Sequence, residues 1–330
     1  MLYIHGAGHF HPQNIIDNAF LEGLDIGTNN QWIMDRVGIE KRHTVLNLED
    51  IKSTHNRVVG EAKVQISSAQ MGAKAIAMAL KRANIKEHQV GMVLAASCSP
   101  TYSLPANACV ISKEAGLDGL AVDISSACSS FAAHMHFLNS MHVDAMPEYV
   151  VCVIPESWTT TTDFSDRRTA VLIGDGAAAV VVSKIHKASM AIEHTTMSSN
   201  PDAWEKVQTK TGHHFYQDGL SVQKFAIKKT IETFKKLEEC SGKHLNLHYF
   251  ISHQANLTML KSVCNKLGVS EDKHLFNVDQ FGNCGAAGAP SVLSQNWHRF
   301  VAGDMITLVV VGAGLTWGGM SISVANRSGQ

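Results

Sequence analysis

The chain of 330 residues is poor in charged residues, has no paired cysteine motif and has no long apolar run. Charged residues make up 17% of the chain and the formal net charge is -1, so no overall field favours nucleic acid or an anionic membrane. No apolar run approaches the length of about 18 to 20 residues that spans a bilayer. The N-terminus also lacks the basic start and apolar stretch of a signal peptide. We therefore expect a cytoplasmic protein that binds neither nucleic acid nor membrane.

The seven cysteines are scattered along the sequence, and no two of them form a C-x-x-C motif. An odd number of widely spaced cysteines in a long chain does not indicate a disulfide framework, so we expect a reducing compartment. No histidine, cysteine and carboxylate cluster has the spacing of a metal site, which predicts a protein without metal. Apolar residues, at 45%, are numerous enough for a large buried core.

Apolar runs without polar alternation predict strands that are buried on both faces. The predicted strands are residues 91–96, 120–124, 149–154, 169–182, 247–251, 275–278 and 305–311, the last continuing through a glycine-rich segment to residue 325. Between these runs, helical spacing of apolar residues predicts helices at 67–83, 129–141 and 221–237. Such alternation favours an α/β fold with parallel sheets and right-handed crossovers.

Three landmarks recur at an offset of about 155 residues. The helix at 67–83 maps onto that at 221–237, the run that begins at Val90 maps onto Asn246, and VDISSACSSF from Val122 maps onto VDQFGNCGAA from Val278. Any α/β protein has some alternation of this kind, but a shared offset favours a duplicated unit. We predict two similar α/β halves, residues 1–184 and 185–330, packed against each other.

Cys128 lies in the segment VDISSACSSF, where a predicted buried strand meets a predicted helix. A thiol at a helix N-terminus faces the positive end of the helix dipole and unpaired N–H groups, and both favour the thiolate. Sites in α/β folds also form at the carboxyl ends of strands. We therefore predict that Cys128 is a nucleophile. The alternative is a small buried apolar side chain, which is what we expect of the other six cysteines.

His253 in the segment SHQAN follows a predicted strand, and Asn283 in FGNCGAAG precedes a predicted helix of small residues. Because the chain has 18 histidines, the residue type alone does not identify His253 as catalytic. The prediction depends on its position at the end of a predicted strand. Asn283 by itself is more typical of a helix N-cap. A cysteine, a histidine and an asparagine that each end a strand of a duplicated unit can converge in one cleft, so together they predict a Cys-His-Asn site.

Two glycine-rich segments, at residues 174–176 and 312–314, resemble phosphate-binding loops only weakly. Neither matches the P-loop pattern or follows a first strand as a dinucleotide-binding motif does. Because both interrupt apolar strand runs, we expect turns, bulges or a close approach of backbone there.

The motifs, in their order along nearly the whole chain, resemble the β-ketoacyl-ACP synthase III branch of the thiolase superfamily. In that family the cysteine of the ACSxF-like segment is acylated, HQAN contains the catalytic histidine and GNxxAA the catalytic asparagine, which correspond to Cys128, His253 and Asn283. Further matching segments are residues 32–42, 166–177 and 312–318. The resemblance implies a thiolase-like fold, in which two βαβαβαββ halves pack as five layers, αβαβα.

The resemblance also implies a ping-pong acyl transfer. Cys128 would be acylated by an acyl-CoA, and the acyl group would then condense with a malonyl thioester, usually malonyl-ACP, with loss of CO2. His253 and Asn283 would donate hydrogen bonds to the developing enolate, and the backbone N–H groups of Cys128 and Gly314 would form the oxyanion hole. The thioesters are substrates, so no cofactor is implied. Fatty-acid initiation and secondary metabolism are both compatible with this reaction.

Five residues would bind the thioesters if the resemblance holds. Trp32 and Arg167 would flank the CoA adenine, and Arg36 would contact the CoA phosphates. The two lysines Lys261 and Lys266 would face an acidic carrier protein. Thr258 stands after HQANL, where the family often has a basic residue, so one of the family's contacts with the carrier protein is missing here.

Leu104 lies in a loop that in this family crosses a homodimer interface and closes the partner's acyl pocket. Acetyl-selective members can carry a bulky aromatic residue there, so a leucine predicts an acyl chain longer than acetyl. Two further departures are Ser130, where the family usually has glycine, and residues 45–65, which are longer and more polar than usual.

These departures keep a second hypothesis open, in which Cys128 passes its acyl group to an oxygen, a nitrogen or a non-malonyl carbon. A third hypothesis is a non-catalytic subunit of a condensing complex, although all three catalytic residue types are present. A thiolase would have a second catalytic cysteine near the C-terminus, where this chain has GAGLTWGG.

Overall fold

A mixed sheet of ten strands forms the centre of the computed structural model, which describes residues 1–242 and 248–326. The first five of these strands in the chain are β1 (Leu2–Phe10), β4 (Val90–Ala95), β5 (Leu120–Asp123), β6 (Tyr149–Glu156) and β7 (Gly176–Ser183). The other five are β8 (Met190–Ser199), β11 (Tyr249–Ser252), β12 (His274–Leu275), β13 (Met305–Gly312) and β14 (Thr316–Val324). Their order in the sheet is β12-β11-β13-β14-β8-β1-β7-β6-β4-β5.

The two halves of this sheet have the same strand order and the same strand directions. In the first half β5, β4 and β6 are parallel, and β7 and β1 follow antiparallel. In the second half β12, β11 and β13 are parallel, and β14 and β8 follow antiparallel. Antiparallel pairing of β1 with β8 joins the halves. The duplicated α/β fold is thereby confirmed, whereas a division into domains at residues 184 and 185 stays a prediction.

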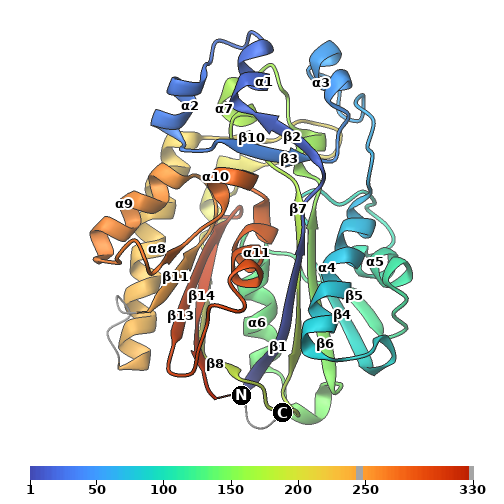
Figure 1. Cartoon of the computed structure of the whole chain (residues 1–330), viewed down its shortest axis with the longest axis vertical. Helices are drawn as coiled ribbons and strands as arrows, with labels where there is room; N and C mark the ends of the chain where they lie inside the picture. Colours follow the sequence, from blue (N-terminus) through green and yellow to red (C-terminus); the bar gives the residue numbers. More distant parts are fainter. Residues whose placement is uncertain (243–247, 327–330) are drawn as a thin grey trace.

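Helices cover both faces of each half (Figure 1). The helices are α4 (Ser68–Ala83) and α5 (Asn107–Ala115) outside the first half, α8 (Gly219–Ser241) and α9 (Leu257–Leu267) outside the second half, and α6 (Ser130–Ser140) and α11 (Gly288–Gln295) between the halves. With the two halves of the sheet, they make five layers in the order αβαβα, as the family resemblance implies.

Helix α4 has the helical spacing that its sequence predicts, and both of its ends are capped. The Ser67 hydroxyl accepts a hydrogen bond from the Gln70 N–H at 3.2 Å, and the Gln70 side chain accepts one from the Ser67 N–H at 3.0 Å, which closes a capping box. Asn84 ends the helix in the left-handed conformation. The helix packs very closely on β1, because a Cβ at Gly8 would lie 2.0 Å from the carbonyl oxygen of Ala75.

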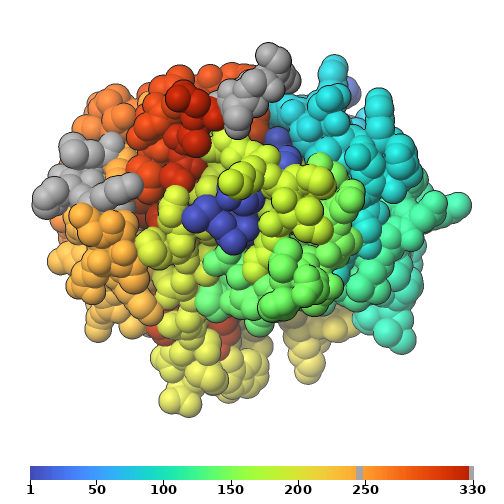
Figure 2. Space-filling view, turned by 90° about the horizontal axis from the view of Figure 1, so that it is seen from below, coloured from blue at the N-terminus to red at the C-terminus, as the bar shows by residue number. Residues whose placement is uncertain are grey.

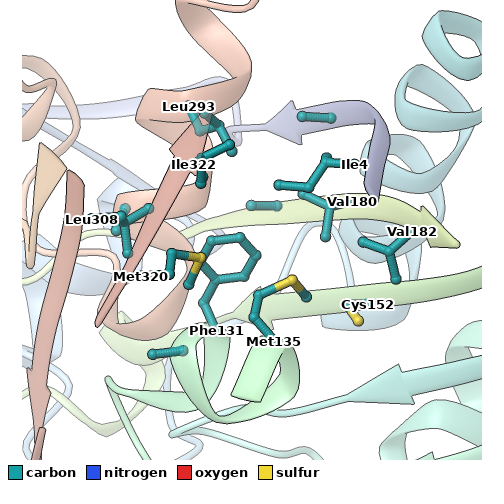
Figure 3. Packing of buried hydrophobic residues seen from close by; sticks show 14 of the residues in the cluster. Ile4, Phe131, Met135, Cys152, Val180, Val182, Leu293, Leu308, Met320 and Ile322 are labelled. Carbon is teal, nitrogen blue, oxygen red and sulfur yellow. The ribbon is translucent and has the colours of Figure 1, made fainter. Parts of the chain in front are cut away.

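The largest hydrophobic core lies between the two halves. Figure 3 shows Phe131 and Met135 of α6 between Met320 of β14 on one side and Val180 of β7 on the other. All four side chains are buried. Helix α6, which begins just after Cys128, is therefore held by side chains from both halves of the sheet.

Shorter elements gather at the end of the molecule opposite to the two termini (Figure 1). They are β2 (Asn14–Asp17), β3 (Lys41–Thr44), α1 (Asn18–Gly23), α2 (Asn30–Arg36), α3 (Leu48–Thr54), α7 (Arg167–Ala170), α10 (Val278–Phe281) and the small sheet of β9 (Val207–Gln208) and β10 (Tyr216–Gln217). Short segments of 3-10 helix are η1 (Glu87–Gln89), η2 (Val143–Ala145), η3 (Trp158–Thr161), η4 (Pro201–Lys206) and η6 (Gly285–Ala287). Figure 2 views the opposite end, where the N-terminal residues, in blue, lie within green and yellow-green segments.

Two strand predictions are wrong in part. The run 169–182 is not one strand, because its first residues belong to α7, which the Asp166 side chain caps, and β7 begins only at Gly176. The run 275–278 is divided in the same way, since β12 ends at Leu275 and Val278 begins α10. A short apolar run does not distinguish a buried strand from a buried helical turn. Of the run 247–251, residue 247 lies outside the described residues.

In the two described ranges, no helix combines the length and the apolar character needed to cross a membrane.

Replacing Phe131 with alanine should remove about 3 to 5 kcal/mol from the free energy of unfolding, because the ring fills the core between the halves. Urea denaturation of the wild type and the variant measures this difference. Phe137→Ala on the same helix is the matched control: its side chain is 52% exposed, and the expected change is within about 0.5 kcal/mol. Equal losses in the two variants would contradict the assignment of this core.

Candidate active site around Cys128

Cys128 lies in a tight turn between β5 and α6. Ala127 has a φ of +45°, and the N–H groups of Ser129 and Ser130 donate to the carbonyl oxygens of Ser126 and Ala127, both at 3.0 Å. The Ser130 hydroxyl accepts from the Ser126 N–H at 2.9 Å and donates to the Ala127 carbonyl at 2.6 Å. The hydroxyl that this chain has in place of the family's glycine therefore braces the turn, and α6 begins two residues after the cysteine.

The Cys128 side chain is 6% exposed and belongs to a small apolar cluster. The other buried members of this cluster are Trp158, Ile173 and Phe215, and the half-buried residues Cys98, Leu172 and Val207 pack against it. Trp158 and Phe215 meet edge to face, with ring centroids 4.7 Å apart. Sequence reasoning missed Cys98, Trp158, Phe215 and Val207, because their positions along the chain share no spacing.

The end of β13 lies against the Cys128 turn. A Cβ at Gly312 would be 2.9 Å from the Cys128 nitrogen and 2.8 Å from the Ser129 nitrogen, so only glycine fits there. The hydroxyl of Thr316 lies 2.7 Å from that of Ser129. Gly314, with a φ of +125°, is therefore in a loop that is attached to the Cys128 turn at both ends. The GAG segment makes a close backbone approach, as its position in a strand run predicts.

His253 directly follows β11, as predicted. Its N–H donates to the carbonyl oxygen of Val309 at 2.9 Å, on the same strand that reaches the Cys128 turn through Gly312. The imidazole is 8% exposed, and its Nδ1 has no hydrogen-bond partner among the described residues. Burial lowers the pKa of His253 to about 4, so the ring is neutral at pH 7 and has one N–H donor.

Asn283 does not end a strand, which corrects the prediction made for it. It follows the helical turn α10, and its N–H donates to the Leu172 carbonyl at 2.8 Å in a short parallel bridge beside Ile173. Ile173 is also one of the residues packed around Cys128. The Asn283 Oδ1 accepts a hydrogen bond from the Gly285 N–H at 3.0 Å, which fixes the side-chain amide before η6.

Glu156 is a buried carboxylate that the sequence motifs did not single out. Its Oε2 accepts hydrogen bonds from the Cys98 N–H at 2.8 Å and the Ser97 hydroxyl at 3.0 Å, and its Oε1 accepts from the Ala286 N–H at 3.2 Å. It therefore ties the loop beside Cys128 to the segment that follows Asn283. Burial raises the pKa of Glu156 to about 7. The sequence signal that could have identified Glu156 is its position, as a single acidic residue at the end of the apolar run that forms β6.

The Gly174-Asp175-Gly176 segment also serves backbone packing. The Asp175 carboxylate accepts hydrogen bonds from the N–H groups of Val45 and Thr159, both at 2.8 Å, and burial raises the pKa of Asp175 to about 6. A Cβ at Gly174 would lie 2.0 Å from the Phe281 carbonyl oxygen. These contacts hold the long 45–65 segment and the Trp158 turn in place.

Three of the residues predicted to bind CoA meet at the surface. The guanidinium carbons of Arg36 and Arg167 lie 4.8 Å and 4.9 Å from the centre of the Trp32 ring, within the range of cation–π contacts. Trp32 and Arg36 come from α2, whereas Arg167 begins α7.

The other predicted binding residues are exposed. Lys261 and Lys266 lie on α9, which starts beside the end of α2 because the Leu257 N–H donates to the Val37 carbonyl at 2.9 Å. Leu104 is 85% exposed and is not among the residues around Cys128 in its own chain. In the described residues, no group of three or more histidine, cysteine or acidic side chains is placed to hold a metal ion.

Comparisons with known proteins agree with this fold. The sequence profile of 3-oxoacyl-(acyl-carrier-protein) synthase III matches residues 122–201, and the profile of its C-terminal part matches residues 237–324. The β-ketoacyl-(acyl-carrier-protein) synthase III of Coxiella burnetii is 30% identical over 327 residues, covering 96% of this chain and 97% of that protein. The corresponding protein of Oceanobacillus iheyensis is 29% identical over 321 residues, with coverages of 96% and 97%.

Among solved structures, 3-oxoacyl-(acyl-carrier-protein) synthase III from Aquifex aeolicus superposes with a TM-score of 0.87 at 27% identity, over 98% of this chain and all of that one. The duplicated fold and these relatives define a thiolase-fold condensing enzyme, which is an acyltransferase. More narrowly, the chain belongs to the β-ketoacyl-ACP synthase III family, also called the 3-oxoacyl-ACP synthase III family.

His253 should remain neutral from about pH 8 down to about pH 5, because burial disfavours the charged ring. Titration of its ring carbon and proton by NMR measures this, with His253→Gln used to assign the signal. The unfolded chain takes up this proton below its ordinary pKa of about 6.5, so the group's stabilising contribution is complete above that pH and falls as the pH drops towards 4. A titration midpoint near the ordinary value would contradict the buried, neutral ring.

Proposed function

We propose that the chain is a β-ketoacyl-ACP synthase III in which Cys128 accepts an acyl group from an acyl-CoA and then passes it to a malonyl thioester, with malonyl-ACP as the expected extender. One observation carries the proposal: a cysteine in a braced turn, packed under a glycine loop and beside an apolar cluster. A nucleophile that holds a hydrocarbon chain requires such surroundings.

In the first half-reaction, the Cys128 sulfur attacks the thioester carbonyl, and CoA leaves as its thiolate. The negative charge that develops on the carbonyl oxygen requires donors that are already in position. The N–H groups of Cys128 and Gly314 are the candidates, and the contact of Gly312 with the Cys128 nitrogen supports their closeness. The apolar side chains of Trp158 and Phe215 would shield the acyl group from water.

In the second half-reaction, a malonyl thioester loses CO2, and the resulting carbanion attacks the acyl carbonyl to form the β-ketoacyl product and free the cysteine. The enolate that forms on decarboxylation requires neutral hydrogen-bond donors. His253 supplies one N–H because its ring is neutral at pH 7. Asn283 supplies its NH2 group, since its Oδ1 is already occupied by the Gly285 N–H.

The substrate carriers would bind over α2 and α9. The Trp32 ring and the Arg167 guanidinium would flank the adenine of CoA, with Arg36 at its phosphates, which their mutual distances support. Lys261 and Lys266 are exposed cations for an acidic carrier protein. We also propose a homodimer in which Leu104, an exposed leucine, reaches the partner's pocket and admits an acyl chain longer than acetyl. Both fatty-acid initiation and secondary metabolism would use this reaction.

Cys128→Ala should abolish the covalent acyl adduct, because no other residue is proposed to attack the thioester. His253→Ala and Asn283→Ala should each keep the adduct but lower decarboxylation of malonyl-ACP by about 100- to 1000-fold, the usual cost of one donor to a developing charge. Intact-mass measurement after incubation with acyl-CoA detects the adduct, and release of labelled CO2 from malonyl-ACP detects the second step.

These measurements also separate the alternatives. An adduct on Cys128 without any CO2 release from malonyl-ACP would favour transfer to an oxygen, a nitrogen or a non-malonyl carbon. An absence of acyl mass with every acyl-CoA tested would favour a non-catalytic subunit. Normal condensation by Asn283→Ala would show that its assigned role is wrong.

Trp32→Ala should raise the KM for acyl-CoA about tenfold, which corresponds to about 1.4 kcal/mol of lost stacking. The KM for the matching acyl-pantetheine, which has no adenine, should stay the same. Trp204→Ala removes an exposed indole on η4 and is the matched control. Equal increases in KM for acyl-CoA and acyl-pantetheine would show that Trp32 does not act by stacking on the adenine.

A further inference from the structure

Cys98 lies next to Cys128, and no step of the proposed condensation uses it. The two sulfur atoms are 3.9 Å apart. Cys98 follows β4 and Cys128 follows β5, and these two strands pair in parallel, so their carboxyl ends adjoin. Both cysteines lie outside the helices and the named strands.

The backbone of Cys98 is held by the buried carboxylate of Glu156. Its N–H donates to the Glu156 Oε2 at 2.8 Å, and the Ser97 and Ser99 hydroxyls donate to the same oxygen at 3.0 Å and 3.4 Å. The hydrogen bond with Cys128, burial and the charge of Glu156 all raise the pKa of the Cys98 thiol well above its ordinary value. Cys98 therefore keeps its proton and is not the sulfur that reacts first with an electrophile or an oxidant.

We propose that Cys98 and Cys128 form a reversible disulfide within one chain when the site meets a hydroperoxide. The bond needs a sulfur–sulfur distance of about 2.05 Å, and the side chains must close the remaining gap by rotation and a small loop movement. Because the disulfide occupies the sulfur that acyl-CoA would acylate, it would block that step; this consequence, but not the disulfide itself, rests on the proposed function.

The chemistry balances with the hydroperoxide as the only oxidant. The Cys128 thiolate attacks the O–O bond, one oxygen joins the sulfur as a sulfenic acid, and the other leaves as an alkoxide or hydroxide that is protonated. The Cys98 sulfur then attacks the Cys128 sulfur, the S–S bond forms, and the hydroxyl leaves with the Cys98 proton as water. The two thiols are oxidised by two electrons in total, and the peroxide is reduced.

The test treats reduced full-length protein with equimolar hydrogen peroxide, alkylates the remaining thiols and maps the peptides by mass spectrometry. The wild type should lose two of its seven alkylated thiols and yield a peptide cross-linked between Cys98 and Cys128, at the mass of a single chain. Dithiothreitol should remove the cross-link. Sulfinic acid on Cys128 without any cross-linked peptide in the wild type would overturn the proposal.

Three variants separate this pairing from general thiol oxidation. Cys98→Ser and Cys98→Ala should both lack the cross-link and accumulate sulfenic and sulfinic acid on Cys128, which dithiothreitol does not fully reverse. Cys109→Ser removes an exposed cysteine on α5 and should form the cross-link as the wild type does. If the Cys98 variants form as much disulfide at Cys128 as the wild type does, Cys128 pairs with another sulfur, and the assignment of Cys98 as its partner is refuted.

A parallel incubation of the reduced wild type with acyl-CoA distinguishes the two proposals. A cross-link without acylation would support the disulfide and contradict the proposed function. Acylation without a cross-link would support the proposed function and contradict the disulfide. When both form, peroxide treatment before acyl-CoA should abolish the acyl mass, and dithiothreitol should restore it.

Discussion

The contact between Gly312 and the Cys128 turn is the constraint on which the site depends. Gly312 ends a strand of the second half, and Cys128 belongs to the first half, so their backbones meet where the two halves, joined along β1 and β8 and packed through a shared core, come together. A side chain at 312 would overlap the nitrogen atoms of the turn. Strand β13 also carries Val309, which positions His253. One strand thus sets the place of two of the three predicted catalytic residues.

Buried carboxylates complete the arrangement on the other side of the cysteine. Glu156 joins the Cys98 loop to the segment after Asn283, and Asp175 joins the Val45 segment to the turn that carries Trp158. Burial raises the pKa values of both acids and lowers that of His253, which is the signature of a site with little water. Such a site strengthens the hydrogen bonds on which a developing negative charge depends.

Helical spacing predicted α4, and apolar runs predicted β4, β5, β6, β11 and β13, whereas the central strands β1 and β8 were not predicted. The position of His253 followed from the end of an apolar run. Asn283 was misplaced because residues 275–278 contain two strand residues and the start of a helical turn, which apolar character alone does not distinguish. The cluster around Cys128 was not predictable, since Trp158 and Phe215 reach it only through tertiary packing.

The same packing gives the Cys128 sulfur two possible partners. An apolar enclosure protects an acyl thioester from water, and a second buried thiol fits that enclosure because free cysteine behaves as a small apolar side chain. Cys98 fills space beside Cys128 as such a side chain, while the hydrogen bonds of Glu156 hold its loop at that distance. A serine or alanine would fill part of the same volume without supplying a second sulfur. The choice of cysteine at position 98 therefore adds a redox property to a site whose packing alone does not require it.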